Sequence, residues 1–336
     1  MFVLQAAVVK GRGGIATAVA HYERMFRAVG VRSTVLFSGP SADQLREQGV
    51  DIIPAPALAT SPLAGALPIL GDLGGAIRTR AAGAPITIIA HSDRTLPVLR
   101  RLLPGARIVA PCHSDKFKHK RRADLVVTLN GAQNAMAQAA LPGVRIAQLG
   151  NPYIAPAPAP LPAGDAVRFN FVARFTPTKD PLTLARAAKL AGDVEVRFIG
   201  AGELEADVRA AAVGVRASFP GWLTAPFAHF HDKDVLVLPS HWEGLPYLLQ
   251  EALDHGAPII AADNAGNRAA LADGAYGALF PIGDADALAG ALRAALGDLD
   301  GLKAKAEKGR AALEPHYGAA AFWRNLRREL EESANV

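Results

Sequence analysis

One stretch of the chain, residues 235–263, constrains the fold more than any other. It opens with an apolar run, Val235–Leu238, and closes with a second one, Pro258–Ala261. The residues between them predict a helix that carries Pro246 in its first turn, where the missing N–H costs nothing, and that runs to about His255. A strand, a helix and a strand in this order predict a parallel sheet with helices packed on its faces.

Two carboxylates mark this unit, Glu243 and Glu251. We expect both on the helix, with Glu243 in its first turn, so that they lie about 12 Å apart at ~1.5 Å per residue. A glycosidase pair must instead flank one bond at roughly 5 to 10 Å. The helix start near Gly244 and Leu245 offers N–H groups and a positive dipole end to an anion. The arrangement matches a sugar, a diphosphate and a ribose in a row.

The flanking residues carry a resemblance to a known family. A strand ends in Pro239-Ser240, Glu243 and Glu251 stand seven residues apart, Ala252-Leu253 follows, and Gly256-Ala257-Pro258 ends the helix. This pattern resembles the motif of retaining GT-B glycosyltransferases of family 4, also described as glycosyl transferases group 1. The resemblance implies that Glu243 contacts the donor sugar and Glu251 the ribose of the nucleoside. The alternative is an amphipathic helix with two exposed glutamates, which the flanking residues disfavour.

Short apolar strands alternate with helices along the whole chain, which predicts an α/β fold with ligands at the carboxyl ends of parallel strands. The resemblance implies the GT-B form: two Rossmann-like domains with a central cleft and a C-terminal helix that crosses back to the N-terminal domain. We expect an acceptor-side domain over residues 1–152, a Pro/Ala-rich linker over 153–166, a donor domain over 167–315, and the returning helix over 316–336.

Composition sets outer limits. The 336 residues suffice for two domains, and no apolar run reaches the roughly 18 residues of a membrane span. The chain starts with a strand rather than a basic leader, so we expect no signal peptide. The one cysteine, Cys112, suits a reducing cytoplasm, and we interpret it as structural.

The net charge of +5 is unevenly placed. Basic residues cluster over Lys116–Arg122, and Arg324, Arg327 and Arg328 form a second group. Both groups fit a solvated face. They fit equally well a contact with anionic lipid headgroups, on the inner face of the plasma membrane, or with a phosphorylated acceptor. No nucleic-acid-binding motif accompanies them, so we expect no nucleic acid partner.

The first turn after a strand is rich in glycine. Gly11-x-Gly13-x-x-Ala16 fits the dinucleotide fingerprint, but the acidic residue that binds the ribose about 20 positions further on is missing. The chain has Phe37-Ser38-Gly39-Pro40 there, which argues against a nicotinamide cofactor. The resemblance implies that Gly13 and Gly14 let the first helix approach the donor phosphates or the acceptor. The alternative is that these glycines only permit tight packing.

Two histidines, His91 and His113, directly follow predicted strands. An imidazole at that edge of a sheet can bond a sugar hydroxyl or shuttle a proton, and a polar loop residue bonded to backbone is the alternative. The resemblance implies that His113 lies over the donor sugar. Cys112 and His113 are adjacent on an extended segment and point opposite ways, so we expect no nucleophile pair.

The second half repeats the pattern. A strand ending near Ala173 leads to Arg174 and Lys179, and Asp180-Pro181 predicts a capped helix start. The resemblance implies that Arg174 and Lys179 clamp the donor diphosphate, where fixed cations stabilise the charge of the leaving group. It also implies that Gly200 and Gly202 bring the backbone close to the nucleotide. The chain departs from the family pattern at Asp263–Arg268, where a Gly-Gly turn and a glutamate are expected.

The sequence predicts no metal and no cofactor. Asp284-Ala285-Asp286 has the form of a metal-binding D-x-D motif, but it opens a helix and is better explained as a cap. No other cluster has metal-ligand spacing.

The resulting prediction is a retaining, metal-independent glycosyltransferase. It would move a hexose or related sugar from a UDP or GDP donor to a glycan or lipid-linked acceptor, in bacterial envelope polysaccharide, lipopolysaccharide or glycolipid synthesis. The resemblance implies that the leaving phosphate takes the acceptor proton. A nucleotide-sugar epimerase of the same fold and a non-catalytic sugar-nucleotide-binding subunit remain alternatives.

Overall fold

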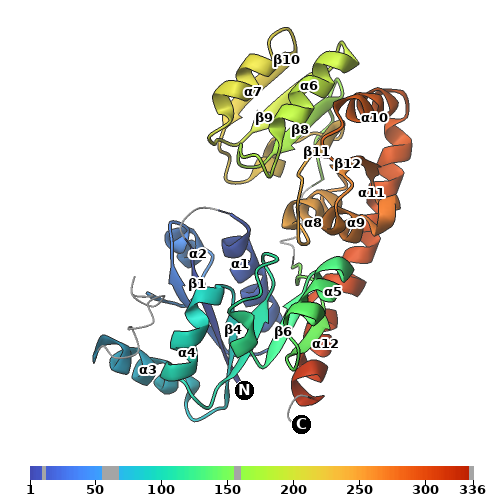
Figure 1. Ribbon diagram of the computed structural model, residues 1–336. Helices are drawn as coiled ribbons and strands as arrows, with labels where there is room; N and C mark the ends of the chain where they lie inside the picture. Colours follow the sequence, from blue (N-terminus) through green and yellow to red (C-terminus); the bar gives the residue numbers. More distant parts are fainter. Residues whose placement is uncertain (10–12, 55–67, 155–159, 333–336) are drawn as a thin grey trace. The chain divides into compact units, whose positions relative to one another are not determined.

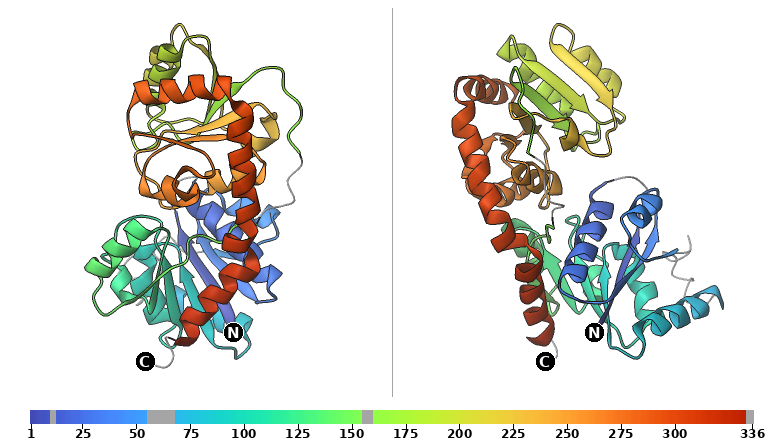
Figure 2. Two further views of the ribbon diagram at one scale, coloured as in Figure 1. Left: turned by 90° about the vertical axis from the view of Figure 1, so that its right-hand side faces the viewer. Right: turned by 180° about the vertical axis from the view of Figure 1, so that it is seen from behind.

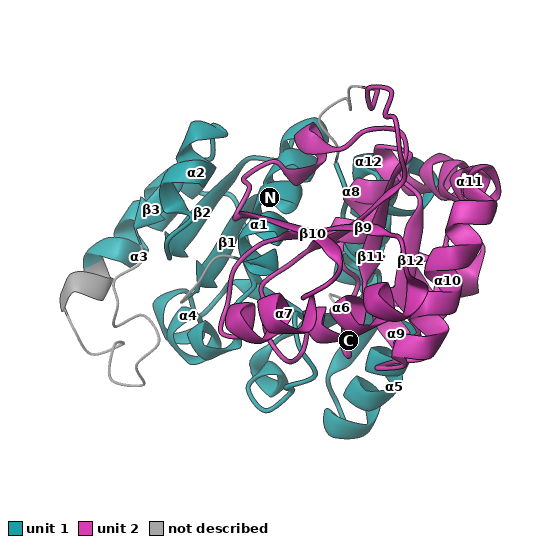
Figure 3. Ribbon diagram, turned by 90° about the horizontal axis from the view of Figure 1, so that it is seen from above, with its two compact units in different colours: residues 1–154, 314–336 teal, residues 155–313 magenta. Residues whose placement is uncertain are grey.

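The chain forms two compact units in the computed structural model, which describes residues 1–9, 13–54, 68–154 and 160–332. Unit 1 comprises Met1–Ile154 together with Glu314–Val336, and unit 2 comprises Ala155–Leu313 (Figure 3). Gly11 of the glycine-rich turn and residues 155–159 of the expected linker lie outside the described residues. Among the described residues, no helix combines the length and the apolar character that crossing a bilayer requires.

Unit 1 contains a seven-stranded parallel sheet in the order β3-β2-β1-β4-β5-β6-β7. Its strands are β1 (Phe2–Val8), β2 (Ser33–Ser38), β3 (Ile52–Pro54), β4 (Ile86–Ala90), β5 (Arg107–Pro111), β6 (Leu125–Thr128) and β7 (Arg145–Gln148). Its helices are α1 (Gly14–Ala28), α2 (Ala42–Glu47), α3 (Pro68–Ala81), α4 (Leu96–Leu102), α5 (Gly131–Ala140) and α12 (Ala319–Glu332). The strand order reverses between β1 and β4, where ligands bind in sheets of this kind.

Helices cover both faces of this sheet (Figure 1). Successive side chains of a strand point to opposite faces, so neighbours on β1 enter different cores. Leu4 packs in the core that includes Leu99 of α4, whereas Val3 packs in the core that includes Phe26 of α1. Both faces of the sheet are therefore buried, which explains why its strands are almost continuously apolar.

The terminal helix α12 lies on the same face of the sheet as α1 (Figure 2). Phe322 packs edge-on against Tyr22 with ring centroids 5.5 Å apart, and Trp323 packs against Phe26 at 5.9 Å. Arg145 on β7 forms a 2.8 Å ion pair with Glu329. The C-terminal helix thus returns to the unit that contains the N-terminus, as the resemblance implies.

Unit 2 contains a six-stranded parallel sheet in the order β10-β9-β8-β11-β12-β13. Its strands are β8 (Arg168–Val172), β9 (Glu195–Ile199), β10 (Arg216–Gly221), β11 (Asp234–Leu238), β12 (Ile259–Ala262) and β13 (Ala278–Phe280). Its helices are α6 (Pro181–Ala191), α7 (Glu205–Ala211), α8 (Tyr247–Asp254), α9 (Ala265–Ala270), α10 (Ala285–Gly297) and α11 (Leu299–Tyr317), the last of which ends in unit 1. The strand order reverses between β8 and β11.

The start of α8 differs from the sequence prediction. The helix begins at Tyr247, and Pro246 is its N-cap with extended backbone (φ −72°, ψ 122°) rather than a residue of its first turn. The proline ring disfavours helical backbone at the preceding Leu245, so the helix cannot extend back through it. The expectation that Glu243 stands on the helix is therefore wrong: Glu243, Gly244 and Leu245 form a loop between β11 and α8.

Candidate functional site

The candidate site of unit 2 lies at the carboxyl edge of its sheet, where the strand order reverses. The loop after β8 contains Arg174 and Lys179, and the loop after β11 contains Glu243. Because β8 and β11 are neighbouring parallel strands, their following loops leave the sheet side by side. The sheet topology thus places cations and a carboxylate at one edge.

Lys179 and Glu243 form an ion pair across these two loops. Lys179 Nζ donates to Glu243 Oε1 at 2.6 Å, and Glu243 is only 7% exposed. A carboxylate this deeply buried is costly unless it is paired and hydrogen-bonded. An ammonium group has three N–H donors, and Glu243 occupies one of those of Lys179. The pair is therefore a fixed centre with hydrogen-bonding capacity to spare.

Asp180 ties the loop after β8 to the loop after β11. Its side chain caps α6 by accepting from Thr183 N at 3.2 Å, and its Oδ2 lies 2.9 Å from His241 Nε2. His241 N also donates to Thr178 O at 2.9 Å. The predicted cap at Asp180 is confirmed. Nothing in the sequence indicates the contact with His241, because it joins residues far apart in the chain.

Two glycines that follow β9, Gly200 and Gly202, pack against the backbone of the loop after β8. A Cβ at Gly200 (φ +141°) would collide with the carbonyl oxygen of Ala173, and a Cβ at Gly202 would lie 2.7 Å from Phe175 N. Phe175 N in turn donates to Ala201 O at 3.0 Å. Only glycine lets the two backbones approach so closely. The predicted turn at Gly200 and Gly202 therefore fixes the backbone on both sides of Arg174.

The loop that carries Glu243 is held in the same way from β12. A Cβ at Gly266 would lie 2.7 Å from Gly244 O, and Asn264 Nδ2 donates to Ser240 O at 2.8 Å. Asn264 also caps α9, accepting from Asn267 N at 3.0 Å. This is the stretch that departs from the family pattern. Here an asparagine and a glycine support the loop of Glu243 from the neighbouring strand.

The other predicted residues of unit 2 take different positions. Arg174 is exposed, and its side chain has no hydrogen-bond partner among the described residues. Glu251 is half-buried on α8, and the side chain of Leu245 is buried in the core, so the loop at Gly244 and Leu245 can offer only backbone groups. The structure thus brings Lys179 and Glu243 into contact, and places Arg174 in the same loop as Lys179.

Unit 1 has its own polar cluster at the carboxyl edge of its sheet. His91 follows β4 and His113 follows β5, and His91 Nδ1 lies 3.0 Å from His113 Nε2 with the rings stacked. Burial and the nearby Lys120 lower the pKa of His113 to about 3. Burial and the neighbouring His113 hold the pKa of His91 well below its usual value. Both imidazoles are therefore neutral near pH 7.

Gly13 and Gly14 stand at the start of α1, with Gly13 as the N-cap. A Cβ at either position would meet no described atom within 4 Å. The alternative that these glycines only permit tight packing therefore has no support in the described part of the chain.

The basic segment 116–122 is not one continuous surface. Lys120 is 1% exposed, forms an ion pair with Asp93 and donates to Pro111 O at 3.3 Å. Its inclusion in an exposed basic patch is therefore wrong, because its ammonium group serves the interior of unit 1. The remaining cations of the segment, Lys116, Lys118, Arg121 and Arg122, are exposed. Nearby Cys112 is buried, and burial raises the pKa of its thiol to about 12, in line with a structural role.

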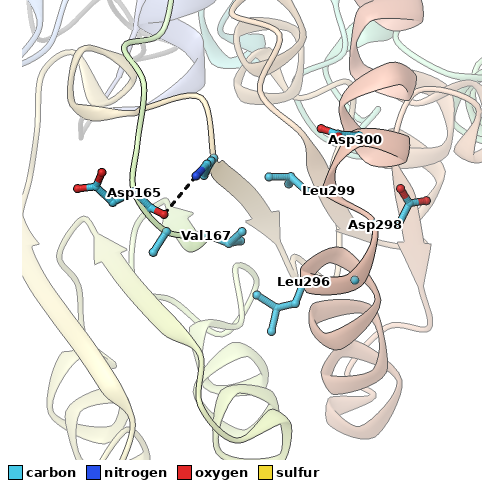
Figure 4. Close-up of a pocket in the computed structure, with 9 residues that line it drawn as sticks. Asp165, Val167, Leu296, Asp298, Leu299 and Asp300 are labelled. Carbon is cyan, nitrogen blue, oxygen red and sulfur yellow. Dashed lines mark hydrogen bonds between the residues drawn. The ribbon is translucent and has the colours of Figure 1, made fainter.

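Two further features lie away from these clusters. Asp284 caps α10 by accepting from Ala287 N at 2.8 Å, and the described residues contain no group of three or more His, Cys, Asp or Glu side chains poised to hold a metal. A cavity of about 390 Å³ lies beside Val167 and Lys233, at the amino ends of β8 and β11 (Figure 4). It is at the opposite edge of the sheet from Glu243 and is separate from the site.

Comparisons with known proteins agree with this architecture. Residues 166–298 match the family model described as glycosyl transferases group 1. The chain is 33% identical over 142 residues to the UDP-Gal:alpha-D-GlcNAc-diphosphoundecaprenol alpha-1,3-galactosyltransferase of Escherichia coli, a match that covers 37% of this chain and 35% of the relative. It is 34% identical over 183 residues to the D-inositol 3-phosphate glycosyltransferase of Geodermatophilus obscurus, covering 49% of this chain and 39% of that one.

Solved structures extend the likeness to the whole chain. The crystal structure of Anabaena Alr3699/HepE in complex with UDP-glucose matches with a TM-score of 0.76 and 17% identity, covering 99% of this chain and 100% of that chain. The fold is that of the GT-B glycosyltransferases, and the match to the glycosyl transferases group 1 family covers residues 166–298. The predicted resemblance and fold class are confirmed. The matches to the two curated relatives span little more than a third of their length.

The close approach at Gly202 yields a stability prediction. Gly202→Ala forces a methyl group against the backbone of Phe175, and overpacking of this kind costs about 1–3 kcal/mol of unfolding free energy. Gly290→Ala is the matched control, because it lies in α10 with nothing within 4 Å of its Cβ and should stabilise the chain by up to ~1 kcal/mol. Urea unfolding of both variants measures the difference. Equal stability would show that the loops do not pack as described.

Proposed function

We propose that the protein is a retaining glycosyltransferase that moves a sugar from a nucleotide-diphosphate donor to an acceptor hydroxyl. One observation carries the proposal: Lys179 pairs with the buried carboxylate of Glu243 at the reversal of strand order in unit 2. A carboxylate that accepts from hydroxyl groups, fixed against a cation that binds phosphate, suits a sugar joined to a diphosphate. The family match of residues 166–298 supports the same class of ligand.

The diphosphate would bind to the cations of the loop after β8. Lys179 retains N–H donors beyond the one used by Glu243, and the exposed Arg174 offers a planar guanidinium that can bind two phosphate oxygens at once. Backbone groups at Gly200, Gly202, Gly244 and Leu245 would line the phosphates and the nucleoside, and Glu251 would bind the ribose. These groups would also stabilise the negative charge that grows on the leaving diphosphate.

Glu243 would accept hydrogen bonds from hydroxyl groups of the sugar. The family resemblance also implies a contact between His113 and the donor sugar, and Gly13 and Gly14 would leave room for a ligand at the start of α1. Neither Glu243 nor His113 is assigned as a nucleophile in this proposal. The leaving phosphate would take the proton from the acceptor hydroxyl, and attack from the side of the leaving group retains the anomeric configuration.

Names of similar proteins support the proposed donor and acceptor classes. The Escherichia coli relative is named for a UDP-galactose donor and a diphosphoundecaprenol-linked acceptor, and the Anabaena structure contains UDP-glucose. We therefore propose a UDP sugar ahead of a GDP sugar, and a glycan or lipid-linked acceptor of envelope polysaccharide synthesis. Lys116, Lys118, Arg121 and Arg122 would contact an anionic membrane at its cytoplasmic face.

Product stereochemistry tests the proposal directly. A thermal-shift screen of UDP and GDP sugars identifies the donor, since a ligand at 100 times its Kd adds about 2.7 kcal/mol of stability. NMR of the reaction with that donor and an alkyl-diphosphate-linked GlcNAc acceptor should then show a product with the anomeric configuration of the donor. A product of inverted configuration would contradict retention. An epimerised sugar nucleotide in the absence of acceptor would instead identify an epimerase.

The role of Glu243 gives a second prediction. Glu243→Ala should lower kcat by about 10- to 150-fold, because it removes a hydrogen bond to a charged group worth roughly 1.5–3 kcal/mol. Binding of UDP, measured by calorimetry, should survive because Arg174 and Lys179 remain. Glu205→Ala, on the exposed face of α7, is the control and should leave both quantities unchanged. An unaltered rate in Glu243→Ala would refute the assignment.

Removal of divalent metal gives a third prediction. In this proposal Arg174 and Lys179 supply the positive charge that a metal ion supplies in other transferases. Sugar transfer should therefore continue at an unchanged rate after dialysis against EDTA. A loss of activity that Mg²⁺ or Mn²⁺ restores would show that the cationic loop does not suffice.

A further inference from the structure

A chain of hydrogen bonds runs through the interior of unit 1 and ends at His113. Glu23 Oε2 lies 3.0 Å from Gln5 Nε2, Gln5 Oε1 lies 3.0 Å from His91 Nε2, and His91 Nδ1 lies 3.0 Å from His113 Nε2. Ser33 Oγ donates to the same carboxylate oxygen at 2.8 Å. The residues come from α1, β1, β2 and the ends of β4 and β5, so only the folded sheet assembles them.

The chemistry of each group fixes the direction of every bond. A carboxylate accepts only, so the amide nitrogen of Gln5 faces Glu23 and the amide oxygen faces His91. An amide oxygen also accepts only, so the proton of His91 is on Nε2 and its Nδ1 is an acceptor. His113 must then donate from Nε2. A neutral imidazole has one N–H, so Nδ1 of His113 is left with a lone pair.

Burying these polar groups costs free energy, so the hydrogen-bond chain does more than fill the core. Gln5 is 0% exposed, His91 2% and Glu23 6%, and buried polar groups destabilise a fold unless all of them are satisfied. Tyr22 closes the chain from one side, with its ring edge-on to His91 at 5.0 Å. Each of the nitrogen and oxygen atoms named above has a partner, whereas Nδ1 of His113 has none among the described residues.

We propose that Glu23, Gln5 and His91 are positioning residues that hold His113 as the neutral Nε2–H tautomer, with Nδ1 presented as a hydrogen-bond acceptor to a sugar hydroxyl. The last step rests on the proposed function, which places His113 at the sugar. The tautomer itself follows from the hydrogen bonds of unit 1 alone.

The amide of Gln5 also determines what the chain cannot do. It relays the orientation of hydrogen bonds, but its oxygen does not take up a proton from His91 at neutral pH, so the carboxylate of Glu23 is not connected to His113 by a path for protons. The charge of Lys120 also lowers the pKa of His113, so His113 does not take up a proton at neutral pH. His113 therefore orients a hydroxyl group and does not act as a proton shuttle, which leaves the acceptor proton to the phosphate.

NMR of ¹⁵N-histidine-labelled protein tests the tautomer without any substrate. Two-bond ¹H–¹⁵N spectra, assigned by loss of the His113 signals in His113→Ala, should show a protonated Nε2 and an unprotonated Nδ1. In His91→Leu the acceptor is lost, and His113 should shift to a mixture of tautomers. In His91→Asn, whose Oδ1 takes the place of His91 Nδ1, the Nε2–H form should return. A His113 that keeps a single Nε2–H tautomer in His91→Leu would overturn the proposal.

Kinetics connect the tautomer to donor binding. His91→Leu should raise KM for the donor sugar nucleotide by about 2- to 10-fold, the effect of one neutral hydrogen bond, and His91→Asn should recover most of it. Thr87→Val is the control: Thr87 is a buried polar residue on β4, the strand that precedes His91, and makes no hydrogen bond to the four residues of the chain. Its substitution should leave KM and the His113 spectrum unchanged. A KM that rises equally in His91→Leu and His91→Asn would show a structural effect only.

The two readouts separate the two proposals. If the spectra show the expected tautomers and KM does not move, the hydrogen-bond chain stands and the assignment of His113 to the sugar fails. If wild-type His113 carries its proton on Nδ1, the chain is refuted whether or not the protein transfers sugar.

Discussion

The ion pair between Lys179 and Glu243 is the interaction on which the candidate site of unit 2 depends. Glu243 is nearly removed from solvent, and a buried carboxylate without its partner costs about 3–5 kcal/mol. The pair joins two loops that leave neighbouring strands, so its geometry is set by backbone contacts rather than by the side chains alone. Gly202 and Gly266 allow those contacts, because each stands where a Cβ would collide with the opposing loop. The close backbone contacts at these glycines thus fix the two loops that position the Lys179–Glu243 ion pair.

Each unit places a polar cluster at the same topological point by different electrostatic means. In unit 1 the strand order reverses at β1 and β4, and the cluster is the neutral pair His91 and His113. In unit 2 it reverses at β8 and β11, and the cluster is the charged pair Lys179 and Glu243. Parallel sheets direct their loops to one edge whatever residues these carry, so the chemistry of each edge is decided by local sequence. The fold thus provides one such edge in each unit, and the side chains make one neutral and the other charged.

The sequence predicted what periodicity and turn chemistry control. The apolar runs at 235–238 and 258–261 located β11 and β12 to within a residue, and Asp180-Pro181 marked the start of α6 correctly. It failed where a tertiary contact or a single proline decided the outcome. Pro246 delayed α8 and moved Glu243 into a loop. Lys120 resembled its exposed basic neighbours, yet the fold buries it against Asp93. Gln5 lies in an otherwise apolar strand. No local pattern in the sequence predicts that Glu23 and His91 both hydrogen-bond to its amide.

The two clusters differ in charge, and each would suit a different requirement of the proposed sugar transfer. A diphosphate gains negative charge as it leaves, so fixed cations stabilise the transition state more than the ground state, which is the condition for catalysis. A sugar hydroxyl needs orientation, and a charged imidazole would lose its acceptor lone pair and repel the positive charge that develops on the ring. Burial and Lys120 keep His113 neutral, and the amide of Gln5 determines its tautomer through His91. In the proposed reaction the cations of unit 2 would stabilise the leaving diphosphate, and a neutral His113 would orient a hydroxyl group.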